Sequence, residues 1–484
     1  MALLPYRLAR QTGLALVPGA SGWSLWLRDD ADSDQLQELL RAQGQPEAVC
    51  RLDSRAFDER LGQLYQAGDG ATAALIEGIG AQVDLDGLMS EMPHIEDLLE
   101  SDDEAPVIRL INGLFAEALR SQASDIHIET FEQSLVVRLR VDGHLRELLR
   151  PPRALSAMLV SRIKVMARLD IAEKRQPQDG RITLRSGGRE VDVRVSTLPG
   201  IHGERVVMRV LDKQASLLAL PNLGMPAAVE QGLRGCLGRP NGIVLSTGPT
   251  GSGKTTTLYA SLNSLNDGSR NILTVEDPVE YAIAGIGQTA INPRAGLTFA
   301  SGLRAILRQD PDVIMLGEIR DQETAQIAVQ ASLTGHLVLS TLHTNSAVGA
   351  VTRLRDMGIE PFLIASCLRG VLAQRLVRRL CSCAVRQPLQ AAECSLWPEL
   401  DRLAHSYHPR GCEDCQGSGY RGRLGLYEFI ELDAGLIALL YAGASEVAMQ
   451  DYLDGRRQSL AGMASDCLAR GDTSLAEVLR AVQG

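Results

Sequence analysis

The segment GIVLSTGPTGSGKTTTLYASL, residues 242–262, constrains the fold of this chain more than any other feature. It satisfies the G-x-x-x-x-G-K-[ST] pattern, with a β-rich run before the glycines and a helix-compatible stretch after them. The pattern predicts a strand, a phosphate-binding loop whose backbone N–H groups surround a phosphate, and a helix. The predicted nucleotide-binding residues of this loop are Gly248, Pro249, Thr250, Gly251, Ser252, Gly253, Lys254, Thr255 and Thr256.

Further β-rich runs downstream end in polar side chains. PDVIMLGEIRD has an apolar strand, Val313–Leu316, that ends in Gly317-Glu318. ILTVEDPVEY has a β-rich run that leads into Glu276, Asp277 and Glu280. A carboxylate at such a position can polarise an attacking water or hold Mg²⁺, or it is simply a strand-end residue in a surface turn. HLVLSTLHT carries His336 before and His343 after a strand, either as structural residues or as sensors of a γ-phosphate. The predicted catalytic residues are Glu318, Lys254, Glu276, Asp277, His336 and His343, and the predicted Mg²⁺ ligands are Thr255 and Glu318.

Two arginines precede the strand that leads to Glu318. Arg304 and Arg308 are four residues apart, so they share one face of the expected helix. They form either a solvated basic stripe or a pair that points at a phosphate. Their place immediately before the catalytic strand favours the second interpretation.

Composition places the chain among multidomain globular proteins. Its 484 residues suffice for about three domains, and hydrophobic and charged contents of 45% and 22% are globular values. No apolar run has the length of a membrane span, and the N-terminus has no continuous apolar core of a signal peptide. We therefore expect a cytoplasmic protein. A net charge of −10 also argues against a broad basic surface for nucleic acid.

The sharpest change in composition lies at residues 84–104, which hold nine carboxylates and no Lys or Arg. Such a self-repelling run predicts a solvated linker over 84–105. It follows an N-terminal segment, 1–83, whose LQELLRAQG and FDERLGQLYQAG stretches are helix-compatible and which we expect to be a small α/β module. The linker carries most of the net charge, so the overall acidity describes a tether rather than the folded domains.

Two larger regions follow the linker. Residues 106–215 begin with an amphipathic helix and continue with alternating strands, among them LVVRLRVDG with an Asp142-Gly143 hairpin turn. A helix is expected over 155–169, followed by two strands joined at Gly187-Gly188. These patterns predict a compact α+β domain. Residues 226–484, which contain the phosphate loop, form the last predicted domain.

Four signatures stand in order along the chain: the phosphate loop, TVEDPVEY, GLTFASGLRAILRQDPDVIMLGEIRD and TGHLVLSTLHTN. They resemble the Walker A, Asp box, Walker B and His box of the GspE-type secretion ATPases, which power type II secretion and type IV pilus machines. The upstream segments ASDIHIE and VDVRVSTLPGIHGERVVMRVLD resemble the second N-terminal domain of that family. The resemblance covers about 106–484.

The resemblance implies a homohexamer of two-lobed subunits, each with a RecA-like P-loop NTPase domain preceded by the smaller α+β domain and the N-terminal α/β module. ATP and Mg²⁺ would lie between the lobes, with Arg194 and Arg209 of the smaller lobe approaching the phosphates. Glu318 would be the catalytic carboxylate. Arg320 and Arg353 are weaker correspondences, as cleft or subunit-contact residues.

The same resemblance implies partners. The N-terminal module would dock the cytoplasmic domain of a GspL-like inner-membrane protein, and the motor would act on a GspF-like platform protein. The chain would then lie in the cytoplasm, peripheral to the bacterial inner membrane through protein partners only.

Nine cysteines, an odd number, predict reduced thiols rather than a disulfide framework. Four of them occur in an insert at about 378–422: Cys381, Cys383, Cys412 and Cys415. The resemblance implies two C-x-x-C pairs holding Zn²⁺. The first pair here is C-x-C, one residue short, and Cys394 is a candidate substitute for Cys383. The alternative is a shortened loop that keeps its thiols without metal.

Three functions compete with the leading one, a motor that powers pseudopilus assembly for type II secretion. A type IV pilus extension ATPase shares the same motifs, although the single short N-terminal module favours secretion. A nucleic-acid translocase could use the same core, but an acidic chain with 4% aromatic residues offers few stacking surfaces, so we expect no nucleic-acid partner. The third is a nucleotide-gated scaffold without appreciable turnover.

Overall fold

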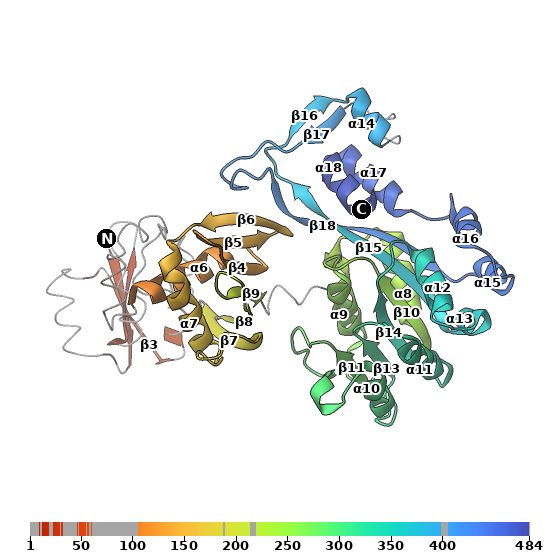
Figure 1. The fold of residues 1–484 in the computed structure, drawn as a ribbon, viewed down its shortest axis with the longest axis horizontal. Helices are drawn as coiled ribbons and strands as arrows, with labels where there is room; N and C mark the ends of the chain where they lie inside the picture. The colour runs from red at the N-terminus through yellow and green to blue at the C-terminus, as the bar shows by residue number, and fades with distance from the viewer. Residues whose placement is uncertain are drawn as a thin grey trace. The chain divides into compact units, whose positions relative to one another are not determined.

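The computed structural model describes residues 105–186, 189–212, 219–397 and 405–483, together with short stretches between 9 and 60. The chain divides into two compact units, 1–213 and 214–484 (Figure 1). Among the described helices, none combines the length and apolar character needed to cross a bilayer.

The described N-terminal stretches form a three-stranded sheet of β1 (Leu14–Pro18), β2 (Trp23–Arg28) and β3 (Ala48–Leu52). β2 pairs antiparallel with β1 and parallel with β3, and Leu14, Leu16, Trp23 and Leu25 pack in one small core. The expected helix LQELLRAQG, most of FDERLGQLYQAG and the acidic linker 84–104 lie outside the described residues.

A six-stranded antiparallel sheet, ordered β6-β5-β4-β9-β8-β7, forms the rest of the first unit. Alternation along β4 sends Ile126 and Ile128 into a core shared with two helices, whereas Asp125, His127 and Glu129 lie on the other face. The elements are α6 (Ala105–Arg120), β4 (Asp125–Thr130), β5 (Leu135–Val141), β6 (His144–Leu149), η1 (Arg153–Leu155), α7 (Ser156–Met166), β7 (Gln178–Ser186), β8 (Arg189–Leu198) and β9 (Arg205–Asp212).

The local predictions for this region hold where the structure describes it. Asp142 and Gly143 have φ values of 47° and 83°, as a two-residue hairpin turn requires. The helix expected over 155–169 is η1 followed by α7, which ends at Met166. The predicted Gly187-Gly188 turn lies outside the described residues, between the paired strands β7 and β8.

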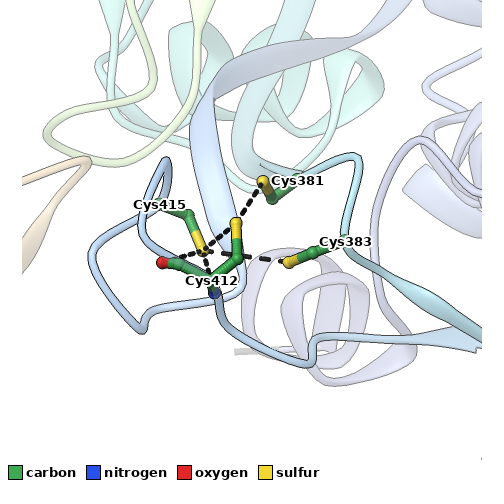
Figure 2. Close-up of side chains that lie close together, drawn as sticks. All are labelled: Cys381, Cys383, Cys412 and Cys415. Carbon is green, nitrogen blue, oxygen red and sulfur yellow. Dashed lines mark hydrogen bonds between the residues drawn. The ribbon is translucent and has the colours of Figure 1, made fainter.

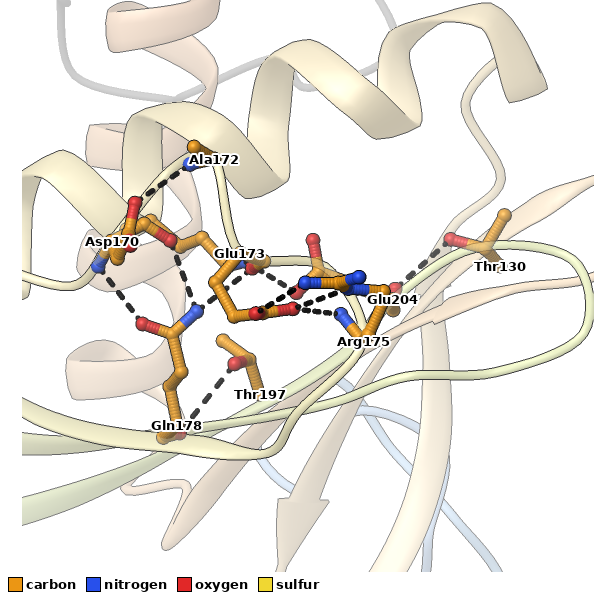
Figure 3. A network of polar contacts seen from close by, with 9 residues as sticks. Thr130, Asp170, Ala172, Glu173, Arg175, Gln178, Thr197 and Glu204 are labelled. Carbon is orange, nitrogen blue, oxygen red and sulfur yellow. Dashed lines mark hydrogen bonds and ion pairs between the residues drawn. The ribbon is translucent and has the colours of Figure 1, made fainter.

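A buried lysine organises the loop between α7 and β7. Lys164, only 1% exposed, donates from Nζ to the Glu173 carbonyl at 2.7 Å and forms an ion pair with Glu204 Oε1 at 2.5 Å. The Gln178 amide donates to the carbonyls of Asp170 and Glu173, both at 3.0 Å, and accepts from the Asp170 N–H at 2.8 Å (Figure 3). The loop is thus fixed by the buried pair of Lys164 and Glu204 and by the partly exposed hydrogen bonds of Gln178.

The second unit is built on a seven-stranded sheet of order β12-β11-β13-β14-β10-β15-β18. All its pairings are parallel except that of β15 with β18. Every residue of β10, β13 and β14 is buried, as expected for strands covered on both faces. The strands are β10 (Gly242–Thr247), β11 (Ile272–Glu276), β12 (Gly287–Ala290), β13 (Val313–Leu316), β14 (Leu337–Leu342), β15 (Leu368–Leu380) and β18 (Tyr420–Glu431).

Helices pack around this sheet, and most of them begin at a Ser, Thr or Asp side chain that accepts a backbone N–H (Figure 1). They are α8 (Ala227–Leu237), α9 (Lys254–Leu265), α10 (Phe299–Ile306), α11 (Gln322–Leu333), α12 (Ala347–Asp356), α13 (Pro361–Cys367), α15 (Ala434–Tyr441), α16 (Glu446–Leu453), α17 (Leu460–Arg470) and α18 (Leu475–Val478), with short turns η2 (Leu220–Leu223), η3 (Pro293–Ala295) and η5 (Leu479–Gln483). The predicted mixed α/β fold is confirmed.

An insert separates β15 from β18. It contains β16 (Val385–Pro388), α14 (Ala391–Leu396) and β17 (His405–His408), with β16 and β17 paired antiparallel. Trp397, just after α14, donates its indole N–H to the Ser465 hydroxyl on α17 at 2.9 Å. The insert is therefore anchored to the C-terminal helices of the same unit.

Candidate nucleotide-binding site and cysteine cluster

Most of the predicted site residues in the second unit lie at or just after the carboxyl ends of four neighbouring strands. β11, β13, β14 and β10 are adjacent and parallel, so the segments after them meet at one edge of the sheet. The phosphate loop follows β10, and Asp277, Glu318 and His343 follow the other three strands. Motifs that are up to about a hundred residues apart in sequence thus share one edge.

Glycine conformations shape the phosphate loop. Gly251 and Gly253 have φ values of 80° and 87°, which side chains with a Cβ rarely adopt. At Gly248, whose φ is 147°, an added Cβ would also lie 2.4 Å from the Gln374 carbonyl oxygen. The loop therefore needs glycine for backbone shape and for close packing on β15. α9 begins immediately afterwards, so its N-terminus faces the loop.

Lys254 folds back over this loop. Its Nζ donates to the carbonyls of Gly248 at 2.7 Å and Pro249 at 3.0 Å, and the residue is 8% exposed. Burial lowers the pKa of Lys254 to about 8, with Glu318 opposing the shift and Arg375 adding to it. The side chain remains mostly cationic at neutral pH. Thr255, in the first turn of α9, is exposed and offers a hydroxyl oxygen for Mg²⁺.

Glu318 lies at the centre of a charged group. It forms an ion pair with Arg320, whose guanidinium is also 3.8 Å from Asp277 Oδ2. His343 Nε2 lies 3.5 Å from Glu318 Oε2. The hydrogen bond from Arg320 holds the pKa of Glu318 below its usual range despite partial burial. Burial, together with the nearby Lys254, lowers the pKa of His343, so this imidazole is neutral at pH 7.

Glu276 occupies a different environment from Asp277 beside it. Its carboxylate is 3% exposed and accepts hydrogen bonds from Thr274 Oγ1 at 2.5 Å, Gln288 Nε2 at 3.1 Å and the Tyr259 hydroxyl. Burial, followed by the contact with Glu276, raises the pKa of Tyr259. Because Tyr259 belongs to α9, this network links the helix after the phosphate loop to the end of β11.

His336 and the pair Arg304 and Arg308 do not lie at the sheet edge that holds the phosphate loop. His336 precedes β14, where its backbone carbonyl accepts from the Gly242 N–H at the start of β10, so it lies at the opposite end of these strands from the phosphate loop. Its Nδ1 lies 2.8 Å from the Ala331 carbonyl. Arg304 bonds to Glu323 on α11 at 2.7 Å and is exposed, as is Arg308. For Arg304 the structure thus shows a solvated ion pair with Glu323.

The two arginines expected from the smaller lobe lie side by side. Arg194 of β8 and Arg209 of β9 are register partners, and Arg209 Nε donates to Asp125 Oδ1 at 3.0 Å. They lie on the face of the six-stranded sheet opposite its helical core, since their neighbours Val193, Val195 and Met208 pack in that core. Arg353 is exposed on α12.

The sequence-based reasoning missed two polar residues beside the loop, Gln374 and Arg375 on β15. Both are buried, at 2% and 5% exposure. Their signal was present in the strand LRGVLAQRLVRRL, where the Gln-Arg pair lies in the middle of the apolar segment GVLAQRLV. Polar groups at such positions need specific hydrogen-bond partners.

The four insert cysteines come together. The Sγ atoms of Cys381, Cys383, Cys412 and Cys415 all lie within 4.8 Å of one another, and Cys394 is not a member of the group (Figure 2). The Sγ–Sγ separations are 3.8 Å for Cys381 and Cys412, 3.9 Å for Cys383 and Cys415, and 3.7 Å for Cys412 and Cys415. Tetrahedral zinc with Zn–S bonds of about 2.3 Å requires sulfurs about 3.8 Å apart.

One of these thiols is electrostatically prepared to ionise. Burial raises the pKa of Cys415, but hydrogen bonds outweigh it and bring the pKa to about 6. They come from the backbone N–H groups of Cys412, at 3.1 Å, and Gly419, at 3.2 Å, and from the thiols of Cys412 and Cys383. Thiolates are the form that binds metal. The shortened C-x-C pair therefore still permits a donor set that fits zinc.

Comparison with known proteins agrees with this architecture. The family described as "Type II/IV secretion system protein" matches residues 100–480, and an N-terminal domain family described under "GSPII protein E" matches residues 3–65. The chain is 54% identical over 489 residues to "Type II secretion system protein E" of Pseudomonas aeruginosa, covering 99% of this chain and 95% of that protein. It is also 54% identical to "Type II secretion system ATPase E" of Vibrio cholerae, covering 99% and 96% of the two chains.

Solved structures show the same fold at lower identity. The Legionella pneumophila ATPase DotB has a TM-score of 0.58 at 22% identity, covering 76% of this chain and 94% of DotB. The pilus retraction motor PilT has a TM-score of 0.53 at 24% identity, covering 76% and 95%. From the sequence matches over nearly its whole length, the chain belongs to the type II secretion system protein E family of secretion ATPases, as its motifs predicted.

Proposed function

We propose that this chain is the ATP-hydrolysing motor that powers pseudopilus assembly and protein export by a type II secretion system. The observation that carries the proposal is the single sheet edge that gathers the phosphate loop, Asp277, Glu318 and His343. The names of relatives that match 99% of the chain support the secretion role. These full-length matches do not favour the alternative, a type IV pilus extension ATPase.

The chain's groups suit phosphoryl transfer to water. In this reaction the water oxygen bonds to the γ-phosphorus and the bond to the β–γ bridging oxygen breaks. One proton of the water passes to a phosphoryl oxygen, and ADP and dihydrogen phosphate leave. Lys254 and the loop N–H groups neutralise phosphate charge, and the ionised Glu318 carboxylate orients the water and accepts its hydrogen bond. Thr255, Asp277 and Glu318 offer the oxygen ligands that Mg²⁺ prefers, and the ion adds positive charge at the phosphates when bound.

His343 and Arg320 adjust the catalytic carboxylate. The ion pair with Arg320 keeps Glu318 ionised, and neutral His343 can donate one hydrogen bond toward Glu318 or a γ-phosphate. Arg194 and Arg209 are proposed to reach the phosphates when the lobes close in a homohexamer. Glu276 is also proposed as a catalytic residue, and its carboxylate accepts three hydrogen bonds.

The N-terminal segment and the cysteine cluster are proposed to have roles outside ATP hydrolysis, in partner docking and in zinc binding. Residues 1–83, which include the N-terminal domain match at 3–65, are proposed to dock a GspL-like cytoplasmic domain, with 84–105 as a tether and a GspF-like protein as the platform. The chain would then be peripheral to the inner membrane through partners alone. Cys381, Cys383, Cys412 and Cys415 are proposed to hold structural Zn²⁺.

Steady-state ATP hydrolysis by the full-length protein tests the enzymatic proposal. Glu318→Gln should keep nucleotide binding but lower kcat by about 100-fold or more, because it removes the charge that orients water. Lys254→Ala should lose binding itself. Glu230→Gln is the matched control, since Glu230 forms an exposed ion pair with Arg234 on α8. Wild-type turnover in the Glu318 variant would overturn the assigned role.

Two further measurements separate the competing functions. Single-stranded DNA should leave the hydrolysis rate unchanged, whereas stimulation would favour a nucleic-acid translocase. Residues 1–83 should co-purify with the GspL-like inner-membrane protein of a secretion platform. Capture of a pilus component in its place would favour the extension ATPase.

A further inference from the structure

We propose that Gln374 is a positioning residue that sets the direction of the phosphate-loop backbone for nucleotide binding. The inference rests on the proposed function, because it takes the loop to hold the β-phosphate. Gln374 belongs to β15, which runs parallel to β10 with Ala373 opposite Thr247, so its side chain lies beside the start of the loop.

The side-chain amide of Gln374 joins three successive parts of the motif. Its Nε2 donates to the carbonyl of Ser252 in the loop at 2.7 Å. Its Oε1 accepts from the Ser246 hydroxyl on β10 at 3.2 Å and from the Thr257 hydroxyl on α9 at 2.9 Å. Strand, loop and helix are thereby fixed to one amide that is 2% exposed.

The bond to Ser252 determines where the next N–H points. In a planar trans peptide the C=O and N–H groups point in opposite directions. Because Gln374 holds the Ser252 carbonyl toward β15, the N–H of Gly253 is directed away from β15. Gly253 is the glycine directly before Lys254, where the pattern predicts backbone donors for the β-phosphate.

Gly253 and Gln374 are also matched in size. A Cβ at Gly253 would lie 3.1 Å from Gln374 Nε2, so the glycine allows the amide to approach the loop closely. Its φ of 87° fixes the peptide in the required orientation. The buried Gln374 amide forms hydrogen bonds with the strand, the loop and the helix. It therefore determines the geometry of the loop as well as filling space in the core.

Positioning makes a prediction that a packing role does not. Contacts to the β-phosphate are equally strong in the ground and transition states, so their loss raises KM and leaves kcat largely unchanged. General loss of structure lowers the active fraction, which reduces kcat without changing KM. The ratio of the two effects therefore distinguishes the roles.

Gln374→Glu in the full-length protein is the sharpest test. The carboxylate can still accept from Ser246 and Thr257, but it places an acceptor against the Ser252 carbonyl where a donor was. We expect KM for ATP and the Kd for ADP to rise at least about tenfold, with kcat at saturating ATP reduced less than about threefold. Gln374→Met, which keeps the volume without adding charge, should shift KM in the same direction.

Gln178→Met is the matched control, because it removes a side-chain amide that also makes three hydrogen bonds, in the other unit. It should lower stability without raising KM. An unchanged KM in folded Gln374→Glu, or in Gln374→Met if the first variant does not fold, would overturn the inference, as would a fall in kcat alone. Absence of ATP turnover in the wild-type chain would overturn the proposed function instead.

Discussion

Replacement of Lys164 by methionine tests the buried ion pair that holds the smaller α+β domain together. Lys164 is 1% exposed and Glu204 is 9% exposed, and their charged atoms are 2.5 Å apart. The ammonium also bonds to the Glu173 carbonyl, so one side chain ties α7 to both the following loop and the start of β9. Methionine preserves most of the volume but leaves Glu204 without its cation.

The magnitude follows from burial. Removal of one partner of a buried pair leaves an uncompensated charge and costs about 3–5 kcal/mol, whereas removal of both is close to neutral. Lys164→Met should therefore lower the free energy of unfolding by that amount. The double variant Lys164→Met/Glu204→Leu should recover most of the loss. Arg120→Gln breaks an exposed pair with Glu117 and should cost about 0–1 kcal/mol.

Hydrogen exchange with mass spectrometry on the full-length protein is the suitable assay. It reports opening free energies for separate segments, so β4 and β9 can be followed while the ATPase unit serves as an internal reference. A loss below about 1 kcal/mol in Lys164→Met would refute the reasoning. Equality between the double variant and the sum of its single variants would refute it as well, because it would show that the two charges do not interact.

Three further predictions concern other parts of the molecule. Gly253→Ala, at a φ of 87° and 3.1 Å from Gln374 Nε2, should weaken ADP binding at least about tenfold in calorimetry, whereas Gly268→Ala, at a φ of 82° with open space around it, should bind normally. Cys383→Ser should abolish bound zinc in metal analysis while Cys394→Ser retains it, and a zinc-free wild type would contradict the proposed site. Burial would raise the pKa of Glu477, but its hydrogen bonds with two arginines lower it from 4.5 to about 2. Its roughly 3 kcal/mol of stabilisation is therefore present above about pH 4.5 and lost as the pH falls toward 2; urea unfolding of Glu477→Gln should show a deficit at pH 7 that shrinks at pH 3, and an equal deficit at both would contradict this.

Strands in the ATPase unit were predictable because their signals are local. The apolar run Val313–Leu316 is β13 with the predicted bounds, and Glu318 follows it after Gly317. A parallel sheet covered on both faces requires such continuous apolar runs. Asp277 and Glu318 lie at one edge of the sheet because β11 and β13 are parallel and each residue comes after the carboxyl end of its strand.

The length of β14 explains why His336 and His343, which were predicted as one pair of site residues, lie apart. A strand of six residues spans about 20 Å, so residues before and after it cannot share one end of the sheet. His343 joins the phosphate edge and His336 lies at the other. The environment of Glu276 was less accessible to sequence reasoning, because Tyr259 and Gln288 reach it only through the tertiary packing of α9 and β12.

Cross-strand register explains how the smaller domain could present positive charge to an anion. The pairs Arg140–Asp125, Asp125–Arg209, Arg209–Arg194 and Arg194–Arg181 form one continuous row across five strands. This row contains four guanidinium groups and one carboxylate, so it keeps a net positive charge. Asp125 is 5% exposed and bonds to Arg209, which restricts the conformations of that arginine. An arginine held in this way loses less entropy when it meets a phosphate, so the buried carboxylate supports the proposed role of Arg209 even though its charge opposes the ligand's.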